Sequence, residues 1–210
     1  MINILIVDDH AIVREGLKRI FLSEPDLNVS GTSVDAAGAV RFLMDKPVDV
    51  IVLDISMPGK NGLDVIKDLK LIRPEVQILI LSMYPEERFA LRSIRAGASG
   101  YLTKERAPED IVTAVRKINS GSNYITPSLA NIIATELQHP SNKASHELLS
   151  EREFEVLCLL ASGKPVVDIA ALLSIGESTV STYRNRVLTK MKMKSNSDLI
   201  HYGIVNGLVE

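Results

Sequence analysis

The sequence predicts a two-domain protein in which an α/β domain with a doubly wound parallel sheet precedes an all-α domain. Two observations lead to this prediction. Over residues 1–120, short apolar runs alternate five times with stretches of helical periodicity, which is typical of buried parallel strands joined by crossover helices. From Leu149 onward the apolar spacing is purely helical. A chain of 210 residues has room for one large domain or two small ones.

The five β/α repeats of the first domain are placed by their apolar runs and by the residues between them. Strands are expected at 2–7, 27–31, 49–53, 76–81 and 99–102, and helices at 11–22, 34–45, 62–72, 86–96 and 108–119. Proline and glycine punctuate these segments, and connections of two to six residues suit compact β/α units. Right-handed crossovers then place helices on both faces of one sheet, which makes a three-layer sandwich.

The rest of the chain is predicted to contain a short helix, a linker and a helix-turn-helix domain. Residues 127–138 have the pattern of the short helix, and residues 139–145 are small and polar, as linkers are. We therefore expect domains at 1–121 and 148–210, with the connecting segment at 122–147.

Four helices are expected in the second domain: the first ends at Ser162-Gly163, and the others lie at about residues 165–173, 177–192 and 197–206. Ser150 and Glu153 form a capping box before the first of them. The third helix is expected to be capped by Glu177 or Ser178. Ile169, Leu172 and Leu173 of the second helix are expected to face the core, and the fourth helix carries Leu199, Ile200 and Ile204. A short turn containing Gly joins the second helix to the third, which is the pattern of a helix-turn-helix.

Composition excludes several classes of protein. Hydrophobic residues make up 46% of the chain and aromatic residues 4%, with no Trp, which suits an aliphatic core. No apolar stretch is long enough to span a membrane and no basic segment precedes the first strand, so we expect a cytoplasmic protein with no membrane partner. Cys158 is the single cysteine, so there is no internal disulfide, and no Cys/His cluster has zinc spacing.

The distribution of charge is more informative than the net charge of −2. Between Glu177 and Asp198 there is no acidic residue, although five basic residues fall there: Arg184, Arg186, Lys190, Lys192 and Lys194. This run is a candidate nucleic-acid surface, and the alternative is a solvated helix face.

Polar residues follow four of the predicted strands. Asp8 and Asp9 follow the first strand, Asp54 the third, Ser82 the fourth and Lys104 the fifth. Because the carboxyl ends of parallel strands line one crevice, these side chains should meet at one edge of the sheet. Three acids at one point need a cation, and hard oxygen ligands suit Mg²⁺. A metal, a carboxylate nucleophile and a lysine can hold a phosphoryl group. His10, next to the acid pair, is interpreted as the start of the first helix.

The motifs at these positions resemble those of one family, the two-component response regulators of the NarL/LuxR type. In the first domain the similar motifs are VDDH (7–10), LDISMPGKNG (53–62), LSM (81–83) and GASGYLTK (97–104). In the second they are LSEREFEVL (149–157), DIA (168–170) and ESTVSTYRNRVLTKM (177–191). The resemblance implies a phosphoacceptor receiver domain with sheet order 2-1-3-4-5, followed by a four-helix LuxR-type DNA-binding domain.

For the receiver pocket, the resemblance implies a role for each matching residue. Asp54 would accept the phosphoryl group, and Asp9 would bind Mg²⁺ directly. Asp8 would act on the ion through water, and the backbone carbonyl of Ser56 would complete its ligands. The protein would be a phosphoryl-accepting transcription factor and not an enzyme, beyond phosphorylating itself and losing that phosphate.

The resemblance also implies how the signal leaves the pocket. Lys104 would contact the phosphoryl oxygens and Ser82 would hydrogen-bond one of them. Tyr101 would turn inward when Ser82 moves. Glu105 follows Lys104 where many receivers have Pro, so the sequence leaves open whether the Lys104–Glu105 bond is cis.

For the second domain, the resemblance implies a helix that enters the DNA major groove. The candidates for base contacts are Ser181, Thr182 and Asn185. Four further residues are expected to contact phosphates or to form local ion pairs: Tyr183, Arg184, Arg186 and Lys190. The implied partners are a sensor histidine kinase, double-stranded DNA and, on activation, a second copy of the chain.

Three other functions compete with this interpretation. A phosphatase that forms an aspartyl-phosphate would need a second Asp two residues after Asp54, where Ser56 stands instead. A nucleotide-binding module would need a GxGxxG or GxxxxGK[ST] motif after a strand, and none is present. A receiver that signals by protein contact alone would not need the helix-turn-helix.

Overall fold

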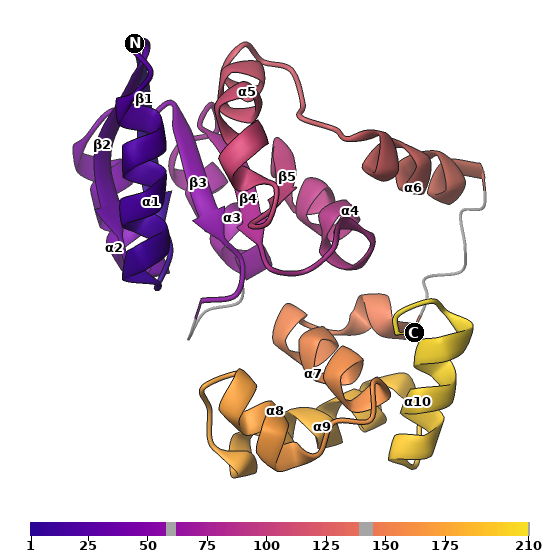
Figure 1. Cartoon of the computed structure of the whole chain (residues 1–210). Helices are drawn as coiled ribbons and strands as arrows, with labels where there is room; N and C mark the ends of the chain where they lie inside the picture. Colours follow the sequence, from indigo (N-terminus) through magenta and orange to yellow (C-terminus); the bar gives the residue numbers. More distant parts are fainter. Residues whose placement is uncertain (58–61, 139–144, 210) are drawn as a thin grey trace. The chain divides into compact units, whose positions relative to one another are not determined.

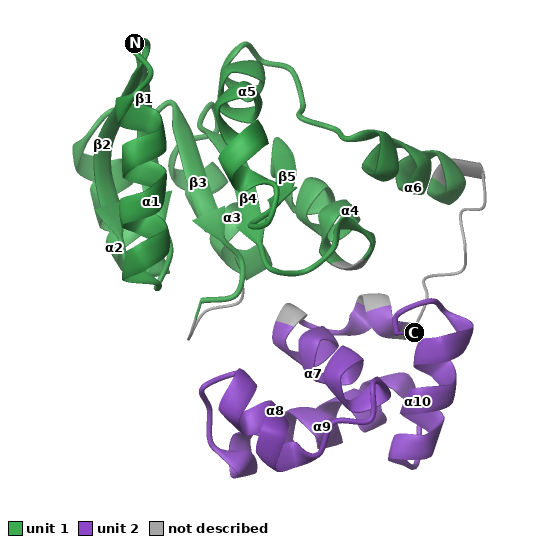
Figure 2. Ribbon diagram, in the orientation of Figure 1, with its two compact units in different colours: residues 1–138 green, residues 139–210 purple. Residues whose placement is uncertain are grey.

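The computed structural model describes residues 1–57, 62–138 and 145–209. Residues 58–61 of the LDISMPGKNG motif and residues 139–144 of the predicted linker lie outside the described residues. The chain divides into two compact units, residues 1–138 and residues 139–210 (Figure 2). Among the described residues, no helix has both the length and the apolar character needed to cross a bilayer.

The first unit begins with five alternating strands and helices (Figure 1). The strands are β1 (Ile2–Val7), β2 (Leu27–Ser33), β3 (Val50–Asp54), β4 (Gln77–Ser82) and β5 (Gly100–Thr103). The helices are α1 (Ala11–Leu22), α2 (Ala36–Asp45), α3 (Gly62–Ile72), α4 (Glu86–Ala96) and α5 (Ala107–Asn119). Each predicted segment is present, with ends that differ by at most two residues.

The strands form one parallel sheet in the order β2-β1-β3-β4-β5, which confirms the predicted doubly wound fold. In register, Val7 pairs with Leu53 and Asp54 pairs with Leu81. Ser82 pairs with Thr103 on the last strand. The residues that follow these pairs therefore emerge at the same edge of the sheet, which is where the candidate site lies.

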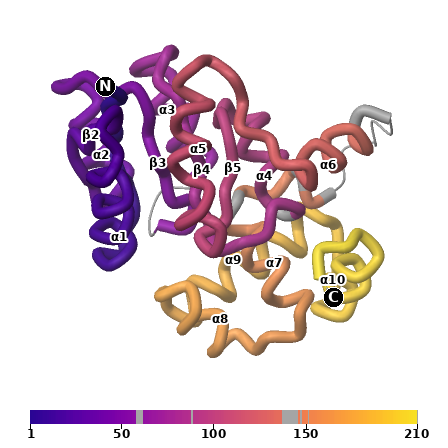
Figure 3. The backbone as a smooth tube through the Cα atoms, turned by 45° about the horizontal axis from the view of Figure 1, so that its top comes forward, coloured from indigo at the N-terminus to yellow at the C-terminus, as the bar shows by residue number. Residues whose placement is uncertain are grey.

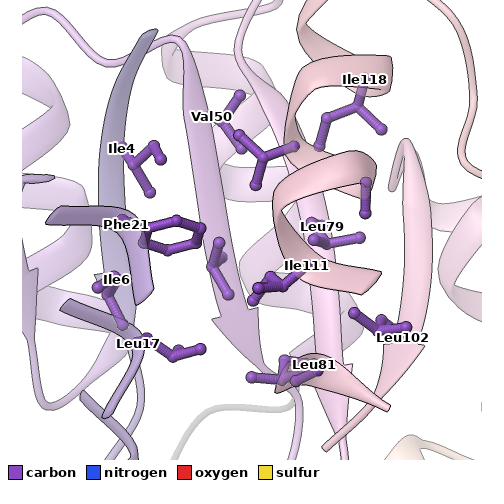
Figure 4. Packing of buried hydrophobic residues seen from close by; sticks show 14 of the residues in the cluster. Ile4, Ile6, Leu17, Phe21, Val50, Leu79, Leu81, Leu102, Ile111 and Ile118 are labelled. Carbon is purple, nitrogen blue, oxygen red and sulfur yellow. The ribbon is translucent and has the colours of Figure 1, made fainter. Parts of the chain in front are cut away.

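Apolar side chains fill both faces of the sheet because strand residues alternate between them. On one face, Ile4 and Ile6 of β1 pack with Leu17 and Phe21 of α1 and with Ile111 of α5 (Figure 4). All five side chains are buried. Helices α1 and α5 therefore cover this face of the sheet.

One further helix, α6 (Pro127–Gln138), belongs to the first unit and packs on α4. The two helices lie side by side in both orientations (Figures 1 and 3). Leu129 of α6 is wholly buried. The helix that the sequence places in the connecting segment is therefore in contact with the α/β sandwich.

The described part of the second unit is helical throughout. A short 3-10 turn, Ser145–Leu148, precedes α7 (Glu151–Ala161), α8 (Val166–Leu172), α9 (Glu177–Met191) and α10 (Asn196–Val205). The predicted capping box is present, because Ser150 Oγ accepts a hydrogen bond from the Glu153 amide and the Glu153 carboxylate accepts one from the Ser150 amide. The four helices confirm the predicted all-α domain, in which α8 and α9 form the helix-turn-helix.

Two local predictions for this unit are wrong. Of the three residues of the second helix that were expected to face the core, Ile169 and Leu173 are buried, but Leu172 is 59% exposed. Leu172 lies about 100° of helical rotation from Leu173, so the two side chains cannot face the same side. The N-cap of α9 is Gly176, without a side-chain cap, and neither Glu177 nor Ser178 takes that position.

Candidate functional site

An acidic pocket lies where β1 and β3 end. Asp8 and Asp54 are each 1% exposed, and the Asp9 side chain is 29% exposed. One ligand atom from each of these three carboxylates and from His10 lies within 4.8 Å of the others. The strand register therefore brings the three predicted acids together from separate parts of the chain.

Lys104, which follows β5, extends into this pocket. Its Nζ lies 2.7 Å from Oδ2 of Asp54 and 2.7 Å from Oδ2 of Asp8. The other Asp54 oxygen, Oδ1, accepts a hydrogen bond of 2.9 Å from the Ser56 amide. The Lys104 amide donates a 2.7 Å hydrogen bond to the Ser82 carbonyl, which ties the segment after β5 to the end of β4. Both carboxylate oxygens of Asp54 thus have a donor.

Burial and neighbouring charges shift the pKa values of Asp54 and Lys104 in opposite directions. Burial raises the pKa of Asp54 above its usual range, and it outweighs the contacts from Lys104 and the Ser56 amide. Burial alone would lower the pKa of Lys104, but its contacts with Asp54 and Asp8 raise it. Lys104 is therefore charged at neutral pH. Three carboxylates around one ammonium leave an excess of negative charge in the pocket.

The donor set fits a hard divalent cation. Carboxylate oxygens are the ligands that Mg²⁺ prefers, and the excess negative charge would favour a bound cation. Ser56, whose carbonyl is a predicted ligand of the ion, lies beside Asp54, and its hydroxyl is buried without a hydrogen-bond partner among the described residues. The pocket residues are therefore compatible with the predicted Mg²⁺.

His10 is the pocket residue whose contacts sequence reasoning missed. It is the N-cap of α1, as its interpretation as the start of the first helix requires. Its ring Nδ1 also lies 2.8 Å from Oδ1 of Asp9 and 3.2 Å from Oδ1 of Asp8. Because His10 directly follows Asp8 and Asp9 in the sequence, its contact with their carboxylates could have been predicted.

Ser82 and Tyr101, the two predicted switch residues, meet at a third residue. Ser82 is wholly buried, and its Oγ accepts a 3.1 Å hydrogen bond from the Tyr84 amide. Tyr101 is also wholly buried, and its hydroxyl donates a 2.9 Å hydrogen bond to the Tyr84 carbonyl. The Tyr84 ring lies 4.9 Å from the Phe89 ring of α4, measured between centroids. Tyr84 thus links the strand ends to α4.

The Lys104–Glu105 peptide bond, whose cis or trans state the sequence left open, is trans, as are all the described peptide bonds.

The candidate DNA-binding residues all lie on α9, the second helix of the helix-turn-helix. Its buried side consists of Val180, Val187 and Met191. Ser181, Thr182, Asn185 and Arg186 are exposed, and Tyr183 is half-buried. Two shallow grooves run along the exposed side, and Thr182 and Arg186 line both of them. The helix therefore presents a continuous polar surface.

Two of the predicted basic contacts are engaged within the unit. Lys190 Nζ lies 2.6 Å from Oε2 of Glu153 on α7. Arg184 Nε donates a 2.6 Å hydrogen bond to Oδ1 of Asn196, the first residue of α10. For these two residues the structure shows local pairs, one of the two roles that the sequence allowed.

Comparison with known protein families accounts for both units. Residues 4–116 match the response regulator receiver domain, and residues 147–203 match the DNA-binding domain of the luxR family of bacterial regulatory proteins. This chain belongs to the luxR-family response regulators. The predicted resemblance is thereby confirmed.

Relatives of this response regulator match it along nearly its whole length. Response regulator UvrY of Escherichia coli K12 is 33% identical over 209 residues, which cover 99% of this chain and 96% of UvrY. The oxygen regulatory protein NreC of Staphylococcus epidermidis is 34% identical over 216 residues, which cover 99% of each chain.

A solved structure of a response regulator with DNA is also similar. RcsB of Salmonella enterica serovar Typhimurium, bound to promoter DNA in the presence of the phosphomimetic BeF3−, has a TM-score of 0.59 and 26% identity. The match covers 96% of this response regulator and 97% of RcsB.

Proposed function

We propose that this response regulator is a transcription factor that is switched by phosphorylation of Asp54. The observation that carries the proposal is the pocket at the strand ends, where Asp54 lies 2.7 Å from Lys104 and beside two further carboxylates. A sensor histidine kinase is the proposed donor of the phosphoryl group, and the cytoplasm, where DNA is accessible, is the proposed place of action.

The pocket residues suit transfer of a phosphoryl group to a carboxylate. An Asp54 oxygen attacks the phosphorus of the kinase's phosphohistidine, the P–N bond breaks, and an acyl phosphate forms. During this transfer the Lys104 ammonium contacts the phosphoryl oxygens, over which the transition state spreads negative charge. Hydrolysis of the acyl phosphate by water restores the carboxylate, so the chain acts only on itself.

A Mg²⁺ ion would be held by the carboxylates of Asp8, Asp9 and Asp54 and by the Ser56 carbonyl. When bound, it would neutralise charge on the phosphoryl oxygens. The ion is proposed because the carboxylates need a counter-charge beyond that of Lys104.

The proposed output of the pocket passes through Ser82. In the structure its Oγ accepts a hydrogen bond from the Tyr84 amide, and a phosphoryl oxygen on Asp54 would give its O–H a charged acceptor that draws the hydroxyl toward the phosphoryl group. If the Ser82 hydroxyl moves away from the Tyr84 amide, the segment around Tyr84 is released. That segment also accepts the hydrogen bond of Tyr101 and contacts Phe89 of α4. Ser82 and Tyr101 are therefore proposed as switch residues.

DNA recognition is proposed for the exposed side of α9. Ser181, Thr182 and Asn185 are the proposed base contacts, and Arg186 is the proposed phosphate contact. RcsB supports this proposal, because its similar chain is bound to promoter DNA in the presence of BeF3−. Two recognition helices would contact half-sites about 10 bp apart, so the active form is proposed to be a homodimer.

The test compares DNA binding by the wild type and by Asp54→Ala, each with and without beryllium fluoride and Mg²⁺. Binding that tightens with beryllium fluoride only in the wild type is the expected result. A coupling of the usual size would tighten it about 5- to 150-fold. Equal binding by both proteins in every condition would contradict the role of Asp54 and leave only the DNA-binding domain.

A further inference from the structure

One carboxylate, that of Glu153, holds two helices of the DNA-binding unit together. Glu153 is 3% exposed and stands at the third position of α7. Its Oε2 accepts a 2.8 Å hydrogen bond from the Ser150 amide and lies 2.6 Å from Lys190 Nζ in the last turn of α9. The capping box holds the Glu153 carboxylate in place. The Lys190 ammonium must therefore give up this contact if it moves away from α7.

The position of Lys190 around α9 agrees with this contact. At 100° per residue, Lys190 lies about 60° from buried Val187 and about 40° from exposed Arg186, but about 140° from Asn185 and about 180° from Ser181. Lys190 therefore stands between the two sides of α9, at the edge of the groove that Arg186 also lines, and its contact with Glu153 directs its ammonium to α7. The Lys190 side chain is 42% exposed, against 4% for Glu153.

A second contact fixes α9 nearer its middle. Arg184 Nε is bonded to Asn196, at the start of α10. Arg186, by contrast, is exposed and has no ion-pair partner among the residues that the structure describes. The basic residues of α9 thus divide into two that contact neighbouring helices and one that is available to a ligand.

We propose that Lys190 is a positioning residue: its ion pair with Glu153 sets the rotation and tilt of α9 against α7, so that Ser181, Thr182 and Asn185 face the DNA, and Lys190 does not itself contact a phosphate. This inference rests on the proposed DNA-binding function of α9. It separates Lys190 from Arg186, which the sequence alone treats as equivalent.

Salt dependence of binding distinguishes the two roles. The full chain with beryllium fluoride and Mg²⁺ is titrated onto a labelled mixed-sequence duplex of about three helical turns, over a series of NaCl concentrations. The variants are Lys190→Met, Glu153→Gln and their double variant. Arg186→Met reports a lost phosphate contact, and Lys164→Met removes one charge from the exposed loop after α7. Circular dichroism establishes that each variant is folded.

Arg186→Met is expected to lower the slope of log K against log salt by about 0.9, the value for one lost phosphate contact. Lys190→Met is expected to keep the wild-type slope and to weaken binding about three- to tenfold. Glu153→Gln removes a negative charge, so electrostatics alone would tighten binding. We expect it to weaken binding about as much as Lys190→Met does, and the double variant to bind no more weakly than either single variant.

Two results would overturn the inference while leaving DNA binding in place. One is a slope lowered by about 0.9 in Lys190→Met, and the other is binding by Glu153→Gln as tight as the wild type or tighter. If Glu153→Gln does not fold, the slope for Lys190→Met decides alone. Failure of the wild type to bind the duplex at all would overturn the proposed function and this inference with it.

Discussion

The Glu86 carboxylate, at the start of α4, accepts a hydrogen bond from the Thr126 hydroxyl, just before α6. Glu86 is 6% exposed and Thr126 is 4% exposed. The same hydroxyl accepts a 3.1 Å hydrogen bond from the Leu129 amide, so Thr126 also caps α6. Near the other end of these two helices, the guanidinium of Arg95 on α4 lies 2.7 Å from the carboxylate of Glu136 on α6. α6 is therefore fixed to α4 at both ends.

Replacing Thr126 by Val, which has a similar shape, is expected to destabilise the protein by about 1–3 kcal/mol. The change removes the cap of α6 and leaves the buried Glu86 carboxylate without this donor. Urea unfolding of the full chain measures the loss. Ser128→Ala is the matched control, because Ser128 donates to exposed Glu87, and it should change stability by no more than about 0.5 kcal/mol. Equal effects of the two changes would contradict the importance of the buried contact.

Ser82→Ala is expected to abolish the response to phosphorylation without preventing phosphorylation itself. The hydroxyl that bonds the Tyr84 amide is lost, so the pocket no longer acts on the segment before α4. The ratio of DNA affinities with and without beryllium fluoride should fall from about 5–150 to about 1. Ser82→Thr keeps the hydroxyl and should keep most of the ratio. A wild-type ratio in Ser82→Ala would show that the switch runs through other atoms.

Mg²⁺ is expected to raise the melting temperature of the unphosphorylated protein through the acidic pocket. At a concentration 100-fold above its dissociation constant, a ligand that binds only the folded state adds about 2.7 kcal/mol. Asp9→Asn should remove most of that gain, because it takes away one of the carboxylates that lie together. Asp45→Asn, at an exposed acid of α2, should retain the gain. An undiminished Mg²⁺ effect in Asp9→Asn would place the ion elsewhere.

The stability that Glu153 provides is expected to depend on pH. Burial would raise the pKa of Glu153, but the contacts from Lys190 and Ser150 outweigh it and hold the pKa below its usual 4.5. The folded state therefore binds this proton less readily than the unfolded state does. The contribution is complete above pH 4.5 and is lost as the pH falls through the folded-state pKa.

Denaturant unfolding across a pH series measures this contribution as the difference between wild type and Glu153→Gln. We expect about 1–2 kcal/mol at neutral pH, shrinking steadily below pH 4.5. Thermal unfolding of Glu155→Gln provides a comparison with a second buried glutamate of α7. A difference for Glu153→Gln that stays constant down to the acid transition would contradict the role of its charge.

Much of the candidate site could be predicted because it depends on strand ends. Asp8, Asp54 and Lys104 are far apart in the sequence, but each follows an apolar run, and a parallel sheet brings such positions to one edge. The same pattern did not reveal Tyr84, because a backbone amide and carbonyl carry no signature in residue type. The contacts of His10 were missed because a helix start accounted for its position.

One error of position arose in α8, a helix of 7 residues. The prediction placed both Leu172 and Leu173 at the core, but neighbouring residues lie about 100° apart around a helix, and only Leu173 is buried. The choice depends on which side the neighbouring helices cover, and that is a property of packing.

The sequence by itself determined the fold class, the order of the elements and the family, because these follow from apolar periodicity and from motifs carried by single segments. Only the tertiary structure decided which roles the basic residues of α9 can take. Lys190 and Arg186 are both exposed basic residues of one run, four positions apart. They differ because α7 places a buried carboxylate 2.6 Å from the Lys190 ammonium, and the distance between two helices is set by packing, which neither helix encodes alone.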